Sequence, residues 1–325
     1  MTTKKSSKKT PVTKKKPGKT TNIKTSKINK TQNGSPLLRS LLGLTILITI
    51  VVSTFVTVHY LFPPELTPPS SSATRYEVFP EEKYDYPAHD YQKPPGESRK
   101  LPQVALIIDD VGYNKRIANQ FADLDSNLTF SVLPNSPHRR IIAKNAHKKG
   151  LEIMLHLPME PIEYPKINPG PNALLVSMSP DELTDNLKNH IASIPYIKGV
   201  NNHMGSRMTA LSSKMYQIFV VLKKEDLFFI DSRTSAQSLC KPSARLLQIP
   251  FAQRDVFLDH LQTPKAVKRQ INLLITHAEK YGSAIGIGHP HEVTYNVLKE
   301  SLENLKSRVK IVHASSLVKP LGQDF

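Results

Sequence analysis

The chain has 325 residues, long enough for one large domain with additional segments or for two small domains. Its formal net charge of +17 is uneven, because eleven Lys and Arg39 within residues 1–62 supply twelve of these charges and no acidic residue lies there. This distribution excludes a basic nucleic-acid-binding domain outside that tail. The single cysteine, Cys240, excludes an intramolecular disulfide and any site built from several cysteines.

Two N-terminal segments differ sharply in composition. Residues 1–36 are rich in Lys, Thr, Ser and Asn, so we expect a disordered basic tail. Within residues 37–62, the 22 residues from Leu41 to Phe62 carry no charge, and as a helix they would span the hydrocarbon core of about 30 Å. Lys and Arg cluster only before this run. The pattern predicts a single-pass anchor in the bacterial inner membrane, with a cytoplasmic N-terminus and a periplasmic C-terminal domain.

Two alternatives exist for this apolar segment. A cleaved signal peptide would have a shorter apolar region and an Ala-x-Ala site after it. A buried core helix rarely contains so long an uncharged run. Residues 63–101 are rich in proline and predict a semi-extended linker between the membrane and the domain. In the cytoplasm the basic tail would meet anionic lipid headgroups, and we expect no specific nucleic-acid partner.

Residues 102–325 alternate between apolar runs and helical patterns, which predicts a single α/β domain, open or barrel-like. Ser179-Pro-Asp-Glu182 predicts the start of a helix that ends near Ile194. Thr263-Pro264 predicts the start of another, ending near Gly282. The predicted strands are 103–108, 128–133, 151–156, 227–231, 284–288 and 309–313, with weaker candidates near 197–201 and 246–250.

The first predicted strand leads directly into two adjacent carboxylates, Asp109 and Asp110, and then Gly112. In parallel sheets, catalytic and ligand-binding groups lie at the carboxyl ends of the strands. Two neighbouring carboxylates there cost free energy unless a cation or a proton separates them. The alternative is an ordinary turn, which Asp and Gly form routinely after strands.

Other predicted strands end in side chains that could take part in metal or acid–base chemistry. These residues are His156, His203, Asp231 and His289, and Arg233 follows two residues after Asp231. A lone histidine is most often a satisfied hydrogen-bonding group. However, parallel strands would bring all these groups to one edge, and burying so many titratable groups without a function is costly. One carboxylate and two imidazoles leave open positions on Zn²⁺, as in hydrolytic metal sites.

Six sequence blocks follow one another along this domain: Ile-Ile-Asp-Asp-x-Gly, His-Leu-Pro-Met-Glu-Pro, Asn-Asn-His-Met-Gly-Ser, Ile-Asp-Ser-x-Thr-Ser, Arg-Asp-Val-Phe-Leu-Asp and Ala-Ile-Gly-Ile-Gly-His. In this order they resemble the divergent polysaccharide deacetylase family, a branch of the NodB-homology carbohydrate deacetylases. The resemblance covers about residues 102–320. It implies a distorted, incomplete (β/α) barrel fold, and it does not extend to the tail, the anchor or the linker.

The resemblance also implies roles for individual residues. Asp109 matches the general base, and Asp110 and His156 match two metal ligands. His289 matches the general acid. Asp231 and Arg233 fall where the main family has residues that orient the catalytic groups.

The chain departs from the family pattern at Glu160, where the His-x-x-x-His motif has its second histidine. We expect His203 to replace this missing ligand. Glu160 could instead bind the metal, or orient His156. Asn202, Arg254 and Asp255 are candidates for substrate binding, although Arg254 and Asp255 could simply pair with each other.

Taken with the anchor, the resemblance implies a membrane-anchored, metal-dependent hydrolase that uses Zn²⁺. Its substrate would be an N-acetylated polysaccharide or peptidoglycan-like glycan of the periplasm or cell envelope. The alternative is a catalytically inactive module that binds glycan or a cell-envelope protein.

Overall fold

The computed structural model describes residues 44–54, 57 and 101–321. The chain divides into two compact units, Met1–Ala73 and Thr74–Phe325. In the first unit, residues 44–54 are helical. Within the described residues, no helix combines the length and the apolar character needed to cross a membrane.

Most of the predicted N-terminal segments lie outside the described residues. This holds for the whole basic tail, for the linker except its last residue, Leu101, and for more than half of the predicted anchor at 37–62. The anchor therefore stays a prediction.

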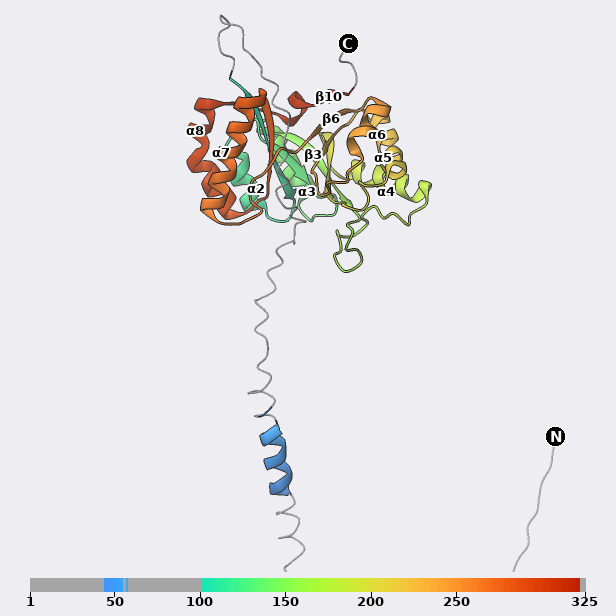
Figure 1. The fold of residues 1–325 in the computed structure, drawn as a ribbon, viewed down its shortest axis with the longest axis vertical. Coiled ribbons are helices and arrows are strands. Elements are labelled where there is room, and N and C mark those ends of the chain that lie inside the picture. Colours follow the sequence, from blue (N-terminus) through green and yellow to red (C-terminus); the bar gives the residue numbers. More distant parts are fainter. Residues whose placement is uncertain (1–43, 55–56, 58–100, 322–325) are drawn as a thin grey trace, which may run out of the picture. The chain divides into compact units, whose positions relative to one another are not determined.

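The second unit is built around one sheet, in which every strand pair is parallel except β6 with β10 (Figure 1). Its strands are ordered β10-β6-β5-β4-β3-β2-β1-β8-β7, and β9 pairs with the first residues of β1. The strands are β1 (Gln103–Val111), β2 (Thr129–Val132), β3 (Glu152–Met159), β4 (Ile197–Met204), β5 (Phe228–Asp231), β6 (Pro250–Gln253), β7 (Val256–Phe257), β8 (Ser283–Gly288), β9 (Lys310–Val312) and β10 (Lys319–Pro320).

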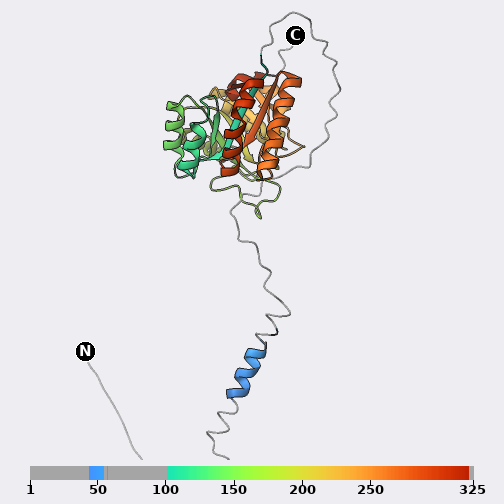
Figure 2. The ribbon, with the colours of Figure 1, turned by 90° about the vertical axis from the view of Figure 1, so that its left-hand side faces the viewer.

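Helices connect successive parallel strands and cover one face of the sheet (Figures 1 and 2). Neighbouring helices pack in the sequence α7–α8–α2–α3 over one part of the sheet and α4–α5–α6 over the other. The helices are α2 (Lys115–Ala122), α3 (Arg139–Lys148), α4 (Pro180–Ser193), α5 (Ser212–Lys224), α6 (Cys240–Leu247), α7 (Pro264–Tyr281) and α8 (Glu292–Arg308), followed by a short 3₁₀ helix, Ala314–Leu317.

The sheet curves until its two edges nearly meet. Strands β6 and β7 lie near opposite ends of the strand order, yet only two residues, Arg254 and Asp255, separate them along the chain. The three Cα–Cα steps from Gln253 to Val256 span about 11 Å at most. The backbone N–H of Arg254 bonds to β5 and that of Asp255 bonds to β8. The fold is therefore an incomplete α/β barrel, as predicted.

Both helices predicted from capping signals are confirmed. The Ser179 side chain and the Glu182 side chain form a reciprocal capping box at the start of α4. Helix α7 begins after Thr263, whose hydroxyl accepts from the Ala266 N–H, and it ends at Gly282 with φ +85°. The weak strand near 246–250 is wrong, because α6 continues to Leu247 and β6 begins only at Pro250.

The two faces of the sheet bury different cores. The face toward the helices joins the large core, and its members on β1 include Val104, Leu106 and Ile108. The inner face, turned away from the helices, buries a smaller core of alternate strand residues. Its buried members are Ala105, Ile107, Met154, Phe228, Ile230, Ile285, Ile287 and Ala314. Because strand side chains alternate, this pattern determines which strand-end residues point inward.

Candidate metal and acid–base site

Several strand ends continue the inner face with polar side chains. Each of these residues lies an even number of positions beyond an apolar residue that packs in the inner core. The set is Asp109 on β1, His156 on β3, Asn201 and His203 on β4, Ser232 after β5, Arg254 after β6, Asp259 after β7 and His289 after β8. Asn201 and His203 are assigned to the inner face because Val200, on the same strand, packs in the large core on the opposite face. Three of them, Asn201, Ser232 and Asp259, were not predicted as site residues.

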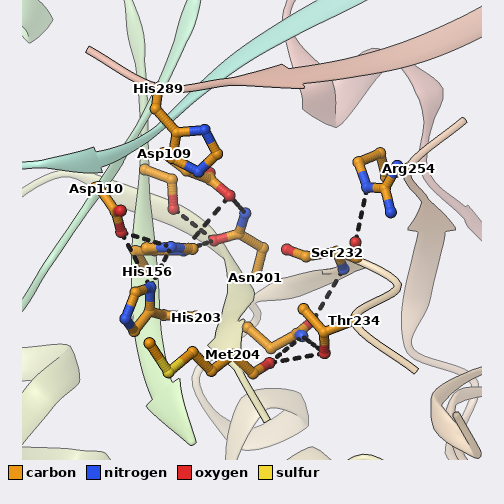
Figure 3. A network of polar contacts seen from close by, with 12 residues as sticks. Asp109, Asp110, His156, Asn201, His203, Met204, Ser232, Thr234, Arg254 and His289 are labelled. Atoms are coloured by element: carbon orange, nitrogen blue, oxygen red, sulfur yellow. Dashed lines mark hydrogen bonds and ion pairs between the residues drawn. The ribbon is translucent and has the colours of Figure 1, made fainter. Parts of the chain in front are cut away.

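Asp110, His156 and His203 meet at the carboxyl edge of the sheet (Figure 3). Asp110 Oδ1 lies 3.2 Å from His156 Nε2 and 3.0 Å from His203 Nδ1, and the two ring nitrogens lie 3.1 Å apart. All three side chains are nearly or fully buried. The predicted grouping of these residues is therefore present in the structure.

Asp110 reaches this cluster because the chain turns sharply after Asp109. By strand alternation alone, Asp110 would point toward the helices, but it adopts φ +54°, an uncommon left-handed conformation that Asp tolerates. Gly112 completes the turn with φ +144°, and a Cβ atom there would lie 1.8 Å from Ser136 Oγ. Only glycine fits this position.

The three converging atoms fit a single divalent cation. Two ligand atoms about 2.1 Å from a metal, at roughly tetrahedral or octahedral angles, lie about 3.0–3.4 Å apart. The measured edges of 3.0, 3.1 and 3.2 Å match this range. Three acceptor atoms held this close in a buried position would repel one another unless a cation or a proton lay between them.

Asn201 links the cluster to Asp109. Its Nδ2 donates to both Asp109 oxygens, at 2.8 and 3.0 Å, and its Oδ1 lies 2.7 Å from His156 Nδ1. Because Oδ1 can only accept, His156 carries a proton on Nδ1, and Nε2 is the ring nitrogen that faces the cluster. The Ser131 hydroxyl also donates to Oδ1, at 2.5 Å. The Asp109 carboxylate fixes the amide orientation, because it accepts from Nδ2.

Asp109 lies beside the cluster, almost fully buried. Burial raises the pKa of this carboxyl group, and the opposing effects of His156, His289 and Asn201 are smaller in total. A raised pKa suits a group that must accept a proton during a reaction near neutral pH.

His289 and Asp259 form a buried pair on the other side of Asp109. His289 Nδ1 lies 2.9 Å from Asp259 Oδ1, while Asp259 Oδ2 accepts from the His289 backbone N–H at 2.6 Å and from the Thr294 hydroxyl at 2.7 Å. Burial alone would lower the pKa of His289, but Asp259 together with Asp110 and Asp109 raises it to about 9. Asp259 stands two residues after Phe257, whose packing on the inner core is the signal that could have identified it.

Glu160 does not join the metal cluster. Its Oε2 accepts from the Val176 N–H at 2.6 Å, and its Oε1 accepts from Arg207 Nη1 at 2.8 Å. The interpretation of Glu160 as a ligand is not supported by these contacts, and neither is a role in orienting His156, because Asn201 performs it. Glu160 instead stabilises the loop between β3 and α4, because it accepts from the Val176 N–H of that loop.

Asp231 and Arg233 contact each other and residues outside the metal cluster. Asp231 follows Phe229 on the helix-facing side, where its oxygens accept from the Arg233 N–H at 2.8 Å and the Ser238 hydroxyl at 2.6 Å. Arg233 has φ +51°, and its Nη1 lies 3.4 Å from Gln253 Oε1. The hydrogen bonds to Asp109, His156 and His289 come instead from Asn201 and Asp259.

The three candidates for substrate binding have different positions. Asn202 connects β4 to the loop after β5, donating to the Met204 carbonyl at 2.7 Å and accepting from the Ser232 N–H at 2.9 Å. Asp255 accepts from the Ile285 N–H at 2.8 Å, on the side of α7. Of the three, only Arg254 continues the inner face of the sheet, two positions after Ala252. Its guanidinium bonds to backbone carbonyls and forms no ion pair with Asp255.

Comparison with known proteins places the chain in a family. The model of the divergent polysaccharide deacetylase family matches residues 106–318. The uncharacterized protein YibQ of Escherichia coli K12 is 37% identical over 216 residues, which cover 66% of this chain and 67% of that protein. An uncharacterized protein of Haemophilus influenzae is 33% identical over 215 residues, 66% of this chain and 76% of that protein.

A solved structure shares the fold. The crystal structure of an uncharacterized protein from Agrobacterium tumefaciens C58 is 28% identical, with a TM-score of 0.65 over 69% of this chain and 92% of that chain. The family match spans the strand ends that carry Asp109, Asp110, His156, His203 and His289. The chain belongs to the divergent polysaccharide deacetylase family.

Proposed function

We propose that residues 102–325 form a metal-dependent hydrolase that removes acetyl groups from an N-acetylated polysaccharide or peptidoglycan-like glycan. The observation that carries this proposal is the triangle of Asp110 Oδ1, His156 Nε2 and His203 Nδ1, flanked by a buried carboxylate and a buried imidazole. These groups suit amide hydrolysis, which needs a base for water and an acid for the leaving amine.

Asp110, His156 and His203 would hold the cation, for which we propose Zn²⁺. When bound, a divalent cation supplies Lewis acidity, which polarises a carbonyl group and eases the deprotonation of water. Two imidazoles and one carboxylate are donors that zinc accepts readily, and they leave positions open for substrate.

Asp109 is the base in this proposal. Its two oxygens are held by the Asn201 amide, and it accepts a proton from the water that attacks the acetyl carbonyl carbon. Asn201 donates to Asp109 and accepts from His156, so one side chain orients both the base and a ligand. The new C–O bond forms as the proton moves to Asp109.

His289 is the acid in this proposal. Its Nδ1 pairs with Asp259, and in this proposal Nε2 donates a proton to the amide nitrogen as the C–N bond breaks. The pKa of His289, raised to about 9, keeps the ring protonated at neutral pH. The products are acetate and a free amino sugar.

Acetate release from N-acetylated glycan tests this function. We expect the full chain with Zn²⁺ to release acetate, and Asp109→Asn and His289→Ala each to lower kcat by about 10²–10⁴-fold. Asp181→Asn changes an exposed carboxylate on α4 and serves as the control. Full activity of Asp109→Asn, or no acetate from the unaltered metal-loaded chain, would contradict the proposal.

The sequence also allows a catalytically inactive module that binds glycan or a cell-envelope protein. This alternative is based on Glu160, which occupies the position of a metal-binding histidine in the family. His203 lies within 3.0 Å of Asp110 in the cluster, which supports the enzyme over the inactive module.

We also propose that the chain is anchored in the bacterial inner membrane, with its N-terminus in the cytoplasm and residues 102–325 in the periplasm. In support, helix residues 44–54 expose Leu44, Ile46 and Leu47 by 54%, 52% and 59%, an apolar surface that needs an apolar environment. Thr49 and Thr54 hydroxyls donate to backbone carbonyls of the same helix, so they need no water. Digestion by protease added to spheroplasts, but not to intact cells, is the expected result for the C-terminal domain.

A further inference from the structure

Two polar side chains of the inner face take no part in the metal cluster, the base or the acid. They are Ser232 after β5 and Arg254 after β6, on neighbouring strands of the sheet. In Figure 3, Ser232 lies between Asn201 and Arg254, so the pair continues the row of polar groups away from the cluster.

The Ser232 hydroxyl is buried and has no hydrogen-bond partner. The Ser232 backbone is fully engaged, because its N–H donates to Asn202 Oδ1 at 2.9 Å and its carbonyl accepts from Arg254 Nε at 2.8 Å. The position of the residue is therefore determined, while its side chain is left unsatisfied. A buried hydroxyl without a partner is costly, and a ligand that pairs with it would remove that cost.

Arg254 is a cation held in place by neutral groups. Its Nε and Nη2 donate to the Ser232 and Arg233 carbonyls, at 2.8 and 3.1 Å, and its guanidinium carbon lies 5.1 Å from the centre of the Phe257 ring. In the part of the chain that the structure describes, no ion pair joins Arg254 to a carboxylate. Desolvation lowers the pKa of Arg254 and the Asp231 carboxylate opposes this effect, so the pKa is lowered to about 10 and Arg254 stays charged at neutral pH.

We propose that Ser232 and Arg254 form a subsite for a carboxylate carried by the sugar, so that the substrate is an acidic N-acetylated sugar. A guanidinium has five N–H donors in a planar fork, and only two are used by backbone carbonyls. The remaining donors match a carboxylate, and the Ser232 hydroxyl can add a third hydrogen bond. This inference rests on the proposed deacetylase function.

Ser232 and Arg254 could bind either of two groups of the substrate, a carboxylate or the acetyl oxygen. A carboxylate subsite discriminates between acidic and neutral sugars. Donors aimed instead at the acetyl oxygen would help every N-acetylated sugar equally, because that oxygen is common to all of them. The comparison of an acidic and a neutral substrate separates the two.

N-acetylmuramic acid and N-acetylglucosamine are suitable probes, because they differ by one carboxylate-bearing ether group. Binding is measured by calorimetry on the metal-free full-length chain in detergent, where no turnover occurs. We expect N-acetylmuramic acid to bind at least tenfold more tightly. Arg254→Gln should lower its affinity by roughly 10- to 100-fold, with a much smaller effect on N-acetylglucosamine.

Ser232→Ala provides an independent test. We expect it to weaken N-acetylmuramic acid binding by about three- to tenfold, and to leave the melting temperature of the free protein unchanged or higher, because no internal hydrogen bond is lost. Arg254→Lys should bind less tightly than the unaltered chain, because it keeps the charge but loses the fork. Arg245→Gln, an exposed arginine on α6, should leave both affinities unchanged.

Equal binding of the two sugars by the unaltered chain would overturn this inference, as would an equal loss for both in Arg254→Gln. The outcome is separable from that of the proposed function. A preference for the acidic sugar without acetate release would refute the deacetylase and retain the subsite. Acetate release without discrimination would retain the deacetylase and refute the subsite.

Discussion

The carboxamide oxygen of Asn201 lies 2.7 Å from Nδ1 of His156. This contact sets the tautomer of a candidate metal ligand, while the amide nitrogen of the same residue holds Asp109. Partners of this kind are known to govern both ligand orientation and metal affinity. Asn201 is thus the point at which the metal cluster and the base are coupled.

Different substitutions of Asn201 should therefore separate its effect on metal binding from its effect on catalysis. Asn201→Asp keeps an acceptor for His156 but sets a second carboxylate against Asp109, so we expect metal binding to be retained and kcat to fall by about 10²-fold or more. Asn201→Leu removes both contacts, and metal affinity should also fall by about 10- to 100-fold.

Calorimetric titration with Zn²⁺ and acetate release measure the two effects. The adjacent Asn202 is a matched control, because it bonds only to β4 and to the loop after β5. Asn202→Ala should lower the free energy of unfolding by about 1–3 kcal/mol with zinc affinity unchanged. Equal zinc affinity in Asn201→Leu and the unaltered chain would refute the role assigned to Asn201.

Asp259 should control the pH dependence of stability through His289. The folded-state pKa of His289 is about 9, above the unfolded value of 6.5. The stabilisation is therefore fully present below about pH 6.5 and is lost as pH rises through 9. For the metal-free chain we expect the free energy of unfolding to fall by up to about 3 kcal/mol across this window.

Asp259→Asn removes the carboxylate, so this fall should largely disappear in denaturant titrations between pH 6.5 and 9. The loss of activity at high pH should also move to lower pH, because His289 would release its proton more easily. A pH dependence identical to that of the unaltered chain would show that Asp259 does not support the charge on His289.

Glu160 and His203 should differ in their effects on metal content. His203→Ala removes one corner of the cluster, so we expect the purified protein to lose bound zinc. Glu160→Gln should retain zinc but lower the melting temperature by about 2–6 °C, because the carboxylate bonds to Val176 and Arg207 would weaken. Elemental analysis and thermal unfolding measure both. The reverse pattern would make Glu160 the ligand.

Metal removal should lower thermal stability. Zinc at about 100 times its dissociation constant would stabilise the folded state by about 2.7 kcal/mol, and a chelator would reverse this. His156→Ala should abolish the shift, because the cluster loses its central imidazole. The exposed His147 on α3 offers a control, and His147→Ala should keep the full zinc-dependent shift.

Much of this protein was predictable from the sequence because it depends on local rules. Apolar runs ending in Asp or His identified the strand ends, and the capping residues of α4 and α7 identified helix starts. Strand alternation would also have found Asn201, two positions before His203, and would have set Asp231 on the helix-facing side after Phe229. These features need only neighbouring residues.

The tertiary structure decided which of these residues meet. Asn201 and Asp109 are 92 positions apart along the chain, and Asp259 and His289 are 30 apart, so their contacts depend on the strand order and the curvature of the sheet. The left-handed turn at Asp110 overrides strand alternation and brings that carboxylate to the cluster. Sequence periodicity reports the direction of a side chain, but only the packed sheet determines what lies opposite it.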